Sequence, residues 1–268
     1  MKFSYTLLKQ FVPPLRSPQH TAQLLNKHLF EVERIEGDVL DVKILANRYS
    51  DAACYHGLAR ALSAALGKRW VAPQVPLVRP ALKTAADVSV EANAGCRRMM
   101  AQYFENVSIG PSPRWLTDAL TGSGMRSINN LVDITNYVML ETGQPLHAFD
   151  FSRMFGGVLM VRNAKRDEHL ETLDGKHSNL SKDTAVLADA HDALDIAGIK
   201  GGRKAEVTAA TTRVLLTAGN FEGSRIHRAS KRLNLSTEAA VRNAHNLSPV
   251  LAERAVARAA QLIVEICG

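Results

Sequence analysis

A proline-rich stretch constrains this chain more than any other feature of its sequence. The stretch contains three closely spaced prolines, Pro73, Pro76 and Pro80. Because proline fixes φ and donates no backbone hydrogen bond, neither a helix nor an inner strand runs easily through such a segment. The apolar patterns before and after it are regular. We therefore predict an extended linker over residues 71–89, between an N-terminal unit (1–70) and a larger unit (90–268).

The N-terminal unit has the pattern of a small α+β fold. Apolar residues at helical spacing end at Pro13, and Ser17 followed by Pro18 is typical of the cap and first residue of a second helix. The runs "FEVERIE" and "DVLDVKIL" alternate on either side of Gly37, which predicts a β-hairpin. The Ala-rich run "CYHGLARALSAALGK" predicts a helix that ends at Gly67.

The larger unit mixes strand and helix patterns, so the whole chain is predicted to be of the α+β class. Runs such as "GVLMVRNA", "TAVLADA", "LDIAGI" and "RVLLTAG" predict strands, while "SPRWLTDALTGSG" and "SINNLVDITNYVMLET" have helical spacing. Within the last of these, "NYVML" taken alone is strand-like. After Pro249 we predict a long amphipathic helix whose apolar face is formed by Leu251, Ala255, Leu262, Ile263 and Ile266.

Composition argues against several classes of protein. No run approaches the ~18 consecutive apolar residues of a membrane span, and the N-terminus does not have the pattern of a secretory signal. We therefore expect no membrane contact and a cytoplasmic location. Cys54, Cys96 and Cys267 are too far apart for a metal motif or a disulfide framework, so we predict no metal and no cofactor. The net charge of +7 favours a polyanionic partner such as nucleic acid.

Two short segments are candidates for a site, and the residues alone leave their roles open. His147 follows a Gly-Gln-Pro turn in "TNYVMLETGQPLHAFD". It either braces that turn through its ring nitrogens or lies at a pocket wall and contacts a ligand. The glycines of "AGIKGG" either form a tight turn between strands or let a ligand lie against the backbone.

Several stretches in a fixed order resemble the β subunit of bacterial phenylalanyl-tRNA synthetase. They are "PSPRWL", "RSINNLVDITNYVMLETGQPLHAFD", "TLDGK", "AGIKGG", "STEA" and the terminal "EICG". In that family the corresponding region, here 90–268, is the B3/B4 domain, which has a mixed α/β structure. Residues 1–70 are similar to the small α+β domain called B1, through "FEVERIE", "NR" and "HGLARAL". The resemblance therefore implies a B1-like domain followed by a B3/B4-like domain.

The resemblance is incomplete. The family's B1 domain contains an inserted OB-fold domain that anchors tRNA, whereas here Gly37 leads directly into "DVLDVKIL". The downstream domains of the full subunit are also lacking, so we expect a fragment, a short subunit or a stand-alone paralogue. No synthetase ATP-binding motif is apparent, and the family places aminoacylation in the α subunit.

The resemblance also implies an editing pocket. In the family, the B3/B4 domain hydrolyses tyrosine wrongly attached to the terminal ribose of the tRNA. It implies two catalytic residues here, His147 and Asn136. It further implies a substrate-binding wall formed by Thr135, Pro145, Gly198, Gly201, Thr217, Thr237 and Ala239. Ester hydrolysis requires modest chemistry, because positioned donors and one oriented water are sufficient.

Two departures from the family pattern bear on mechanism. The family's "L-E-S-A-F-F" contains a glutamate that recognises the tyrosine hydroxyl, and "LLTAGNF" has Thr217 at that position. Threonine is a shorter, neutral partner, so we expect discrimination that depends on that hydroxyl to weaken. At residues 242–249 "RNAHNLSP" replaces "R-F-E-R-G-V-D-P". The family segment is expected to support contacts within the full enzyme, and its change fits a protein released from them.

The basic run "SRIHRASKRL" predicts a helix whose charges either form a solvated face or contact tRNA phosphates. The residues assigned to RNA binding are Arg225, Arg228, Lys231 and Arg232. The expected partner is tRNA or aminoacyl-tRNA, with an α-type synthetase subunit as a second candidate. We expect a module that binds an aminoacyl group and either hydrolyses its ester or transfers it to an amine. The alternative is a non-catalytic tRNA-binding or scaffold module.

Overall fold

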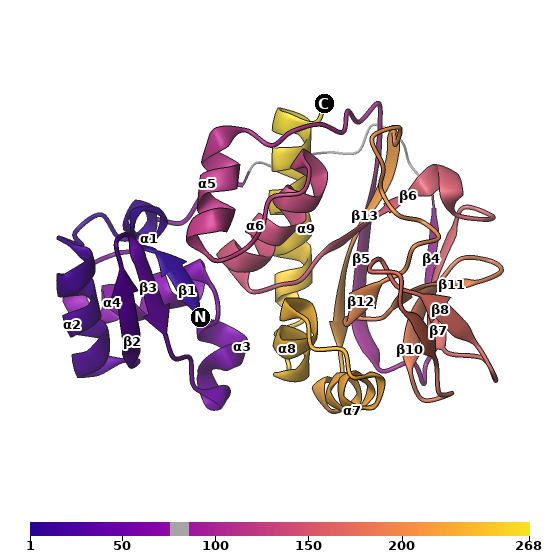
Figure 1. Cartoon of the computed structure of the whole chain (residues 1–268), viewed down its shortest axis with the longest axis horizontal. Helices are drawn as coiled ribbons and strands as arrows, with labels where there is room; N and C mark the ends of the chain where they lie inside the picture. Colours follow the sequence, from indigo (N-terminus) through magenta and orange to yellow (C-terminus); the bar gives the residue numbers. More distant parts are fainter. Residues whose placement is uncertain (76–85) are drawn as a thin grey trace.

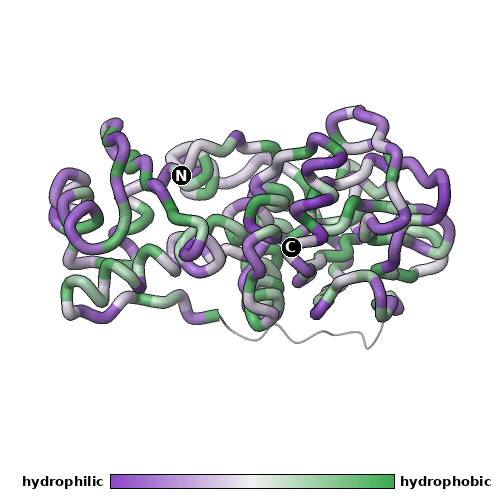
Figure 2. Tube along the Cα trace, turned by 90° about the horizontal axis from the view of Figure 1, so that it is seen from below, coloured by the Kyte–Doolittle hydropathy of each residue, from purple (hydrophilic) through white to green (hydrophobic). Residues whose placement is uncertain are grey.

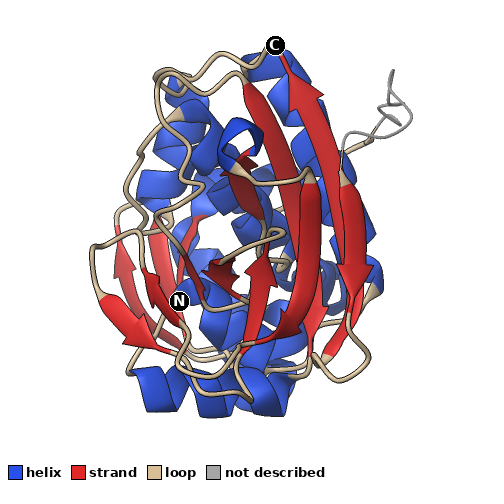
Figure 3. Cartoon of the chain, turned by 90° about the vertical axis from the view of Figure 1, so that its right-hand side faces the viewer, coloured by secondary structure: helices blue, strands red, loops and turns tan. Residues whose placement is uncertain are grey.

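The computed structural model describes residues 1–75 and 86–268 (Figure 1). The N-terminal unit lies at one end of the molecule, a group of long helices lies in the middle, and most strands of the larger unit lie at the other end. Figure 3 shows these strands in front of the helices. Most of the predicted linker, including Pro76 and Pro80, falls outside the described residues.

The N-terminal unit is an antiparallel sheet covered by helices, as its sequence predicts. The sheet has the order β1 (Lys2–Ser4), β3 (Val39–Val42), β2 (Val32–Glu36). The helices and 3-10 turn are α1 (Tyr5–Phe11), α2 (Pro18–His28), η1 (Ala46–Arg48), α3 (Tyr49–Ala52) and α4 (Tyr55–Leu66). The Ser17 side chain accepts the His20 N–H at the start of α2, and Gly67 ends α4 in the left-handed conformation. The hairpin at Gly37 is confirmed.

The central helices are α5 (Arg114–Gly122), α6 (Asn130–Thr142) and α9 (Val250–Ile266). The strand-like interpretation of "NYVML" is wrong, because these residues form the second half of α6. This helix is buried on nearly all sides, so its continuous apolar run reflects burial and not a strand. Its end at Gly143 (φ 89°) is the left-handed position that favours glycine.

The predicted apolar face of α9 needs a correction. Ala255, Leu262 and Ile263 are buried as expected, whereas Leu251 and Ile266 are only partly buried. The remaining buried positions are mostly small: Ala252, Val256, Ala259 and Ala260. Short side chains let the helix axis lie close to its neighbours, so these alanines contribute to the buried face although hydropathy alone gives them little weight.

A long strand, β13 (Arg213–Phe221), is the central strand of a three-stranded sheet in the larger unit. It lies between β5 (Cys96–Glu105) and β6 (His147–Asp150) and pairs antiparallel with both. A second sheet has the order β12 (Lys200–Gly201), β11 (Ala193–Ile196), β10 (Ala185–Ala188), β7 (Val158–Asn163), β4 (Asp87–Val90). A small hairpin joins β8 (His169–Glu171) to β9 (His177–Asn179). Two helices, α7 (Gly223–Leu233) and α8 (Glu238–Ala244), follow β13.

The end of the predicted linker also needs a correction. Residues 87–89 were assigned to it, but they belong to β4, which runs parallel to β7. The alternation in "DVSV" puts Val88 and Val90 on one face, and the strand pairs on one side only, with β7, at the edge of the sheet. Residues 87–89 are therefore part of a sheet of the larger unit and not of an extended linker.

The alternating faces of β13 separate two hydrophobic clusters. Val214, Leu216 and Ala218 face a cluster that includes the central helices and the core of the N-terminal unit. Leu215 and Phe221 belong to a second cluster with the strands of the five-stranded sheet. Figure 2 shows apolar segments both in the N-terminal unit and in the central helices. Because the first cluster runs through both, the N-terminal unit is packed onto the rest of the chain, and the division at 1–70 and 90–268 stays a prediction.

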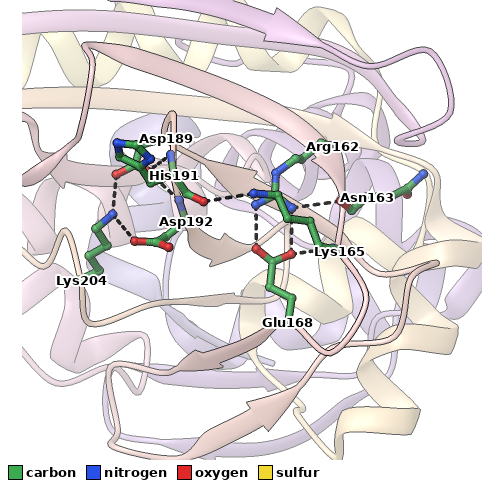
Figure 4. Close-up of polar contacts among 8 residues, drawn as sticks. All are labelled: Arg162, Asn163, Lys165, Glu168, Asp189, His191, Asp192 and Lys204. Atoms are coloured by element: carbon green, nitrogen blue, oxygen red, sulfur yellow. Dashed lines mark hydrogen bonds and ion pairs between the residues drawn. The ribbon is translucent and has the colours of Figure 1, made fainter.

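Buried charges beside β7 and β10 are paired with one another (Figure 4). The Arg162 guanidinium donates two hydrogen bonds to the Glu168 carboxylate, at 2.8 and 2.7 Å. The Asp189 carboxylate accepts from the Lys204 ammonium at 2.7 Å and from the backbone N–H groups of Phe155, His191 and Asp192. Because these charges have internal partners, we assign the cluster a structural role.

Asp189 gives the fold a predictable dependence on acid. Burial alone would raise the pKa of this carboxyl, but backbone donors and Lys204 outweigh it and lower the pKa to about 2. The ionised Asp189 carboxylate therefore stabilises the fold by roughly 2 kcal/mol at pH values above its ordinary pKa near 4. This contribution is lost as the pH falls from about 4 to about 2. When unfolding is measured across this pH range, the free energy of unfolding should fall more steeply with decreasing pH for the wild type than for Asp189→Asn. Equal slopes would contradict the assignment.

Candidate ligand pocket

The turn after α6 is fastened to β13 by a buried glutamine. The Gln144 Nε2 donates to the Pro145 carbonyl at 2.9 Å and to the Gly219 carbonyl at 3.0 Å. Gly143 reverses the chain just before Gln144, and β6 begins three residues after Gln144, at His147. The Gly-Gln-Pro sequence therefore fixes the position along β13 at which β6 begins.

His147 lies directly opposite Thr217 in the pairing of β6 with β13. The Thr217 hydroxyl donates to the His147 carbonyl at 3.3 Å. The imidazole packs edge-on against Phe149, with ring centroids 4.5 Å apart, and is 28% exposed. Backbone pairing, the hydroxyl and the aromatic ring together hold this histidine, while one part of its ring remains open.

The open part of the ring faces a cavity of about 80 Å³. Six residues predicted from the sequence line it: Pro145, His147, Gly198, Gly201, Thr217 and Ala239. Prediction missed the other lining residues, which are Met99, Leu146, Leu187, Asp195, Ile199, Lys200, Gly219, Phe221 and Asn243. The turn, β13, the β11–β12 connection and α8 thus meet at one place, although they are far apart in sequence.

Three predicted residues are not among the described residues that line the cavity. Thr135 is buried in α6, where its hydroxyl donates to the Val132 carbonyl at 2.7 Å. Asn136 follows it on the same helix and is partly exposed. Thr237 caps α8, and its hydroxyl donates to the Ile199 carbonyl at 2.7 Å while accepting the Ala240 N–H. Thr237 therefore holds the glycine-containing connection in place, and the roles of Thr135 and Asn136 stay predictions.

The glycines of "AGIKGG" are required by close approach. Gly198 has φ +68°, and a Cβ there would lie 2.7 Å from the Phe221 ring and 2.9 Å from the Asn243 amide nitrogen. A Cβ on Gly201 would lie 2.7 Å from His147 Cε1 and 2.8 Å from Leu173 Cδ1. Real Cβ atoms essentially never come so close, so a side chain at either position would displace its neighbours. The pocket wall is built from bare backbone at these two points.

Asp195 is the residue whose importance the sequence concealed. It lies on β11, 7% exposed, with Oδ1 accepting the Gly202 N–H at 2.9 Å and lying 3.9 Å from His147 Nε2. Burial raises the pKa of Asp195 well above its usual range, although the Gly202 bond opposes this. The available signal was a carboxylate in the middle of the apolar strand "ALDI", where an unpartnered charge is costly.

The same desolvation acts on the histidine. Burial lowers the pKa of His147 to about 4, so the imidazole is neutral at pH 7. A neutral imidazole has one donor and one acceptor nitrogen, which is the form that orients a water or accepts its proton. Beside it, burial raises the pKa of the Asp195 carboxyl and so favours the uncharged form of that group as well.

Asn243 adds a further polar group at the pocket wall. It is 2% exposed, and its Nδ2 donates to the Gly198 carbonyl at 2.9 Å. Its Oδ1 is buried and has no hydrogen-bond partner among the described residues. Buried polar atoms in native proteins almost always have a partner, so this oxygen is a candidate acceptor for a ligand or a water.

The basic helix α7 divides into two sets of side chains. Arg225 donates to the Asn163 side chain and to the backbone carbonyls of Asn93 and Asp183, and Arg232 pairs with Asp183. These two arginines tie α7 to neighbouring loops. Arg228 and Lys231 are exposed and form no ion pair with any described residue. RNA binding by all four stays a prediction, and the geometry favours the second pair.

The segment 242–249 contacts the N-terminal unit. The His245 ring stacks on Tyr49 with centroids 4.5 Å apart, and Arg242 donates to the Ala53 carbonyl at 3.3 Å. The Asn220 side chain donates to the Leu247 carbonyl at 2.7 Å. In this chain the altered segment thus forms contacts within the molecule.

The larger hollow elsewhere in the described part of the chain is lined by none of the predicted site residues. A cavity of about 510 Å³ lies between the N-terminal unit and the central helices, lined by groups such as Lys2, Glu33, Lys43 and Glu238. Within residues 1–75 and 86–268, no cluster of three His, Cys, Asp or Glu side chains is placed to hold a metal. None of the helices in that part of the chain combines the length and apolarity needed to cross a membrane.

The part of the chain that forms the pocket matches a known protein family. Residues 95–268 match the B3/4 domain family. Over 245 residues the chain is 37% identical to the phenylalanine–tRNA ligase β subunit of Photorhabdus laumondii, covering 91% of this chain and 31% of that protein. It is 41% identical over 232 residues to the β subunit from Anaeromyxobacter dehalogenans, covering 86% and 29%.

The chain spans less than a third of the length of these relatives. Among solved structures, an N-terminal fragment of the phenylalanyl-tRNA synthetase β subunit from Pyrococcus horikoshii matches 90% of this chain and 73% of its own, at 14% identity and a TM-score of 0.45.

Proposed function

The chain belongs to the B3/4 domain family, related to phenylalanine–tRNA ligase β subunits, and from that premise we propose that it binds an aminoacyl group, carried on tRNA, in the pocket beside His147. The observation that supports this most directly is the convergence of His147, Gly198, Gly201 and Thr217 on one cavity. These residues come from three separate segments. A structural histidine and an ordinary glycine turn would not need to share a hollow.

The proposed reaction is hydrolysis of the aminoacyl ester. The neutral His147 orients a water whose oxygen attacks the ester carbonyl carbon. The bond from that carbon to the ribose oxygen breaks, and the leaving oxygen takes up a proton. If an amine occupies the place of the water, the same geometry transfers the acyl group to nitrogen. Asn136 and Thr135, on α6, are not among the described residues that line the cavity, and their predicted catalytic and substrate-binding roles stay predictions.

Incubation with a panel of aminoacyl-tRNAs tests this proposal. We expect at least one to lose its amino acid faster than the spontaneous rate. Adding a small amine distinguishes transfer from hydrolysis, because transfer yields an aminoacyl amide. If every aminoacyl-tRNA survives at its spontaneous rate with and without the amine, catalysis is excluded.

A non-catalytic tRNA-binding module is the second candidate, and the exposed pair on α7 favours it. Arg228 and Lys231 are three residues apart, on one helix face, with no internal partner among the described residues. Such side chains bind phosphates without any role in ester chemistry. An α-type synthetase subunit is a further proposed partner, which co-purification tests.

The α7 pair gives a separate prediction for tRNA binding. Replacing Arg228 and Lys231 with Ala should weaken tRNA binding several-fold at low salt and lower the slope of log K against log[salt] by about 2, because two phosphate contacts are lost. Lys68→Ala with Arg69→Ala is the matched control, because it removes the same charges from exposed positions on the N-terminal unit. Equal weakening by both pairs would show that only net charge matters.

A further inference from the structure

The pocket has a carboxyl group on a different wall from the one the family pattern predicts. The β13 wall has Thr217, whose hydroxyl is occupied by the His147 carbonyl. A strand of the five-stranded sheet, β11, contributes Asp195 to the cavity lining. It is the only Asp or Glu among the described residues that line this cavity. The acidic group has therefore not been lost from the pocket but is supplied by a different strand.

The geometry of Asp195 leaves one oxygen free for a ligand. Oδ1 is held by the Gly202 N–H at 2.9 Å and lies 3.9 Å from His147 Nε2, beyond a direct hydrogen bond. Oδ2 accepts no hydrogen bond from any described residue. Lys200 is the one Lys or Arg among the described lining residues, and its Nζ lies 3.7 Å from the Asp174 carboxylate. The backbone bond therefore orients the carboxyl, while its second oxygen has no internal partner.

Size restricts what can reach this oxygen. A cavity of about 150 Å³ accommodates a benzene ring in a protein interior, whereas this one is about 80 Å³. Phe221 and Met99 occupy part of the wall, and Gly198 packs tightly on the Phe221 ring. An aromatic acyl group would need these side chains to move, but a side chain of a few atoms would not.

We infer that Asp195 determines acyl specificity, and that the pocket selects a small aminoacyl group with a side-chain hydroxyl, such as a seryl or threonyl group, over its apolar counterpart. This inference rests on the proposed function. The substrate hydroxyl would hydrogen-bond to Oδ2, while the ester carbonyl lies toward His147. Burial raises the pKa of the Asp195 carboxyl and so favours its uncharged form, which suits a neutral hydroxyl better than a cation.

The test compares deacylation of Ser-, Thr-, Ala-, Val- and Tyr-tRNA by the whole chain and by Asp195→Ala. The wild type should prefer Ser over Ala and Thr over Val by about 10-fold or more, because the apolar acyl groups leave Oδ2 unpaired. Asp195→Ala should reduce both ratios to near 1. Asp192→Ala is the control, since this residue of the preceding turn pairs with Lys204 outside the cavity and should keep the preference.

Asp195→Asn is a second variant for the case in which Asp195→Ala misfolds. The Oδ1 of the asparagine can still accept the Gly202 N–H. This variant should melt at the wild-type temperature and keep part of the preference. A ratio unchanged in Asp195→Ala, or Tyr-tRNA cleaved faster than Ser-tRNA, would overturn the inference while leaving the proposed function intact. The proposed function itself would be overturned if no aminoacyl-tRNA is deacylated and calorimetry detects no binding of seryl- or alanyl-adenosine amide analogues.

Discussion

Gly201→Ala is expected to slow deacylation by about 10- to 100-fold with little loss of stability. The added Cβ would lie 2.7 Å from His147 Cε1 and 3.2 Å from Asp195 Oδ1. The backbone of His147 is paired to β13 and its ring packs on Phe149, so we expect the added methyl group to shift the ring from its place at the cavity. Displacements of this kind, below about 1 Å, are enough to cost up to a hundredfold when a reacting group is misplaced.

Gly110→Ala is the matched control for this substitution. A Cβ at Gly110 meets nothing within 4 Å, and the residue has no positive φ, so the same chemical change has no steric cost there. Both variants should be compared in initial deacylation rate and in thermal unfolding. A wild-type rate for Gly201→Ala would mean that His147 does not act at this wall. A large drop in melting temperature would mean that the glycine serves the fold.

Local structure in this chain was predictable wherever one segment carries its own signal. Ser17 caps α2, Gly67 ends α4 and the hairpin turns at Gly37, because capping and left-handed turns depend on residues close in sequence. The misread segment "NYVML" shows the limit. A helix buried on all sides loses the one-sided apolar pattern that distinguishes it from a strand.

The pocket was predictable only in part, for a different reason. Motif resemblance locates His147, Gly198 and Thr217 because each lies within a conspicuous run. Asp195 lies in a strand whose sequence is mostly apolar. Its importance comes from its proximity to His147, which is 48 positions earlier in the chain. Likewise Arg225 and Arg232 look like surface charges in sequence, and their internal partners come from distant loops. Such pairings depend on tertiary structure, which a linear pattern does not contain.

Glu238→Ala is expected to lower the free energy of unfolding by about 3 kcal/mol. Its carboxylate pairs with the guanidinium of Arg242, which is 0% exposed, whereas Glu238 itself is 55% exposed. Arg242 also donates to the carbonyls of Glu238 at 3.1 Å and Ala53 at 3.3 Å, while its Nε has no partner among the described residues. Removing the carboxylate leaves a buried cation with only neutral acceptors, which is the costly way to break such a pair.

Two further variants separate this mechanism from loss of an ordinary ion pair. Asp118→Ala removes the partner of Arg114 in a pair of the same i,i+4 spacing whose side chains are 94% and 69% exposed, so it should cost less than about 0.5 kcal/mol. Adding Arg242→Met to Glu238→Ala removes the buried charge and fills its space, so the double variant should be more stable than Glu238→Ala alone. Equal losses for Glu238→Ala and Asp118→Ala would show that water reaches the guanidinium. Because α8 contributes Ala239 and Asn243 to the pocket, the Arg242 contact with Ala53 also makes the N-terminal unit a support for the site.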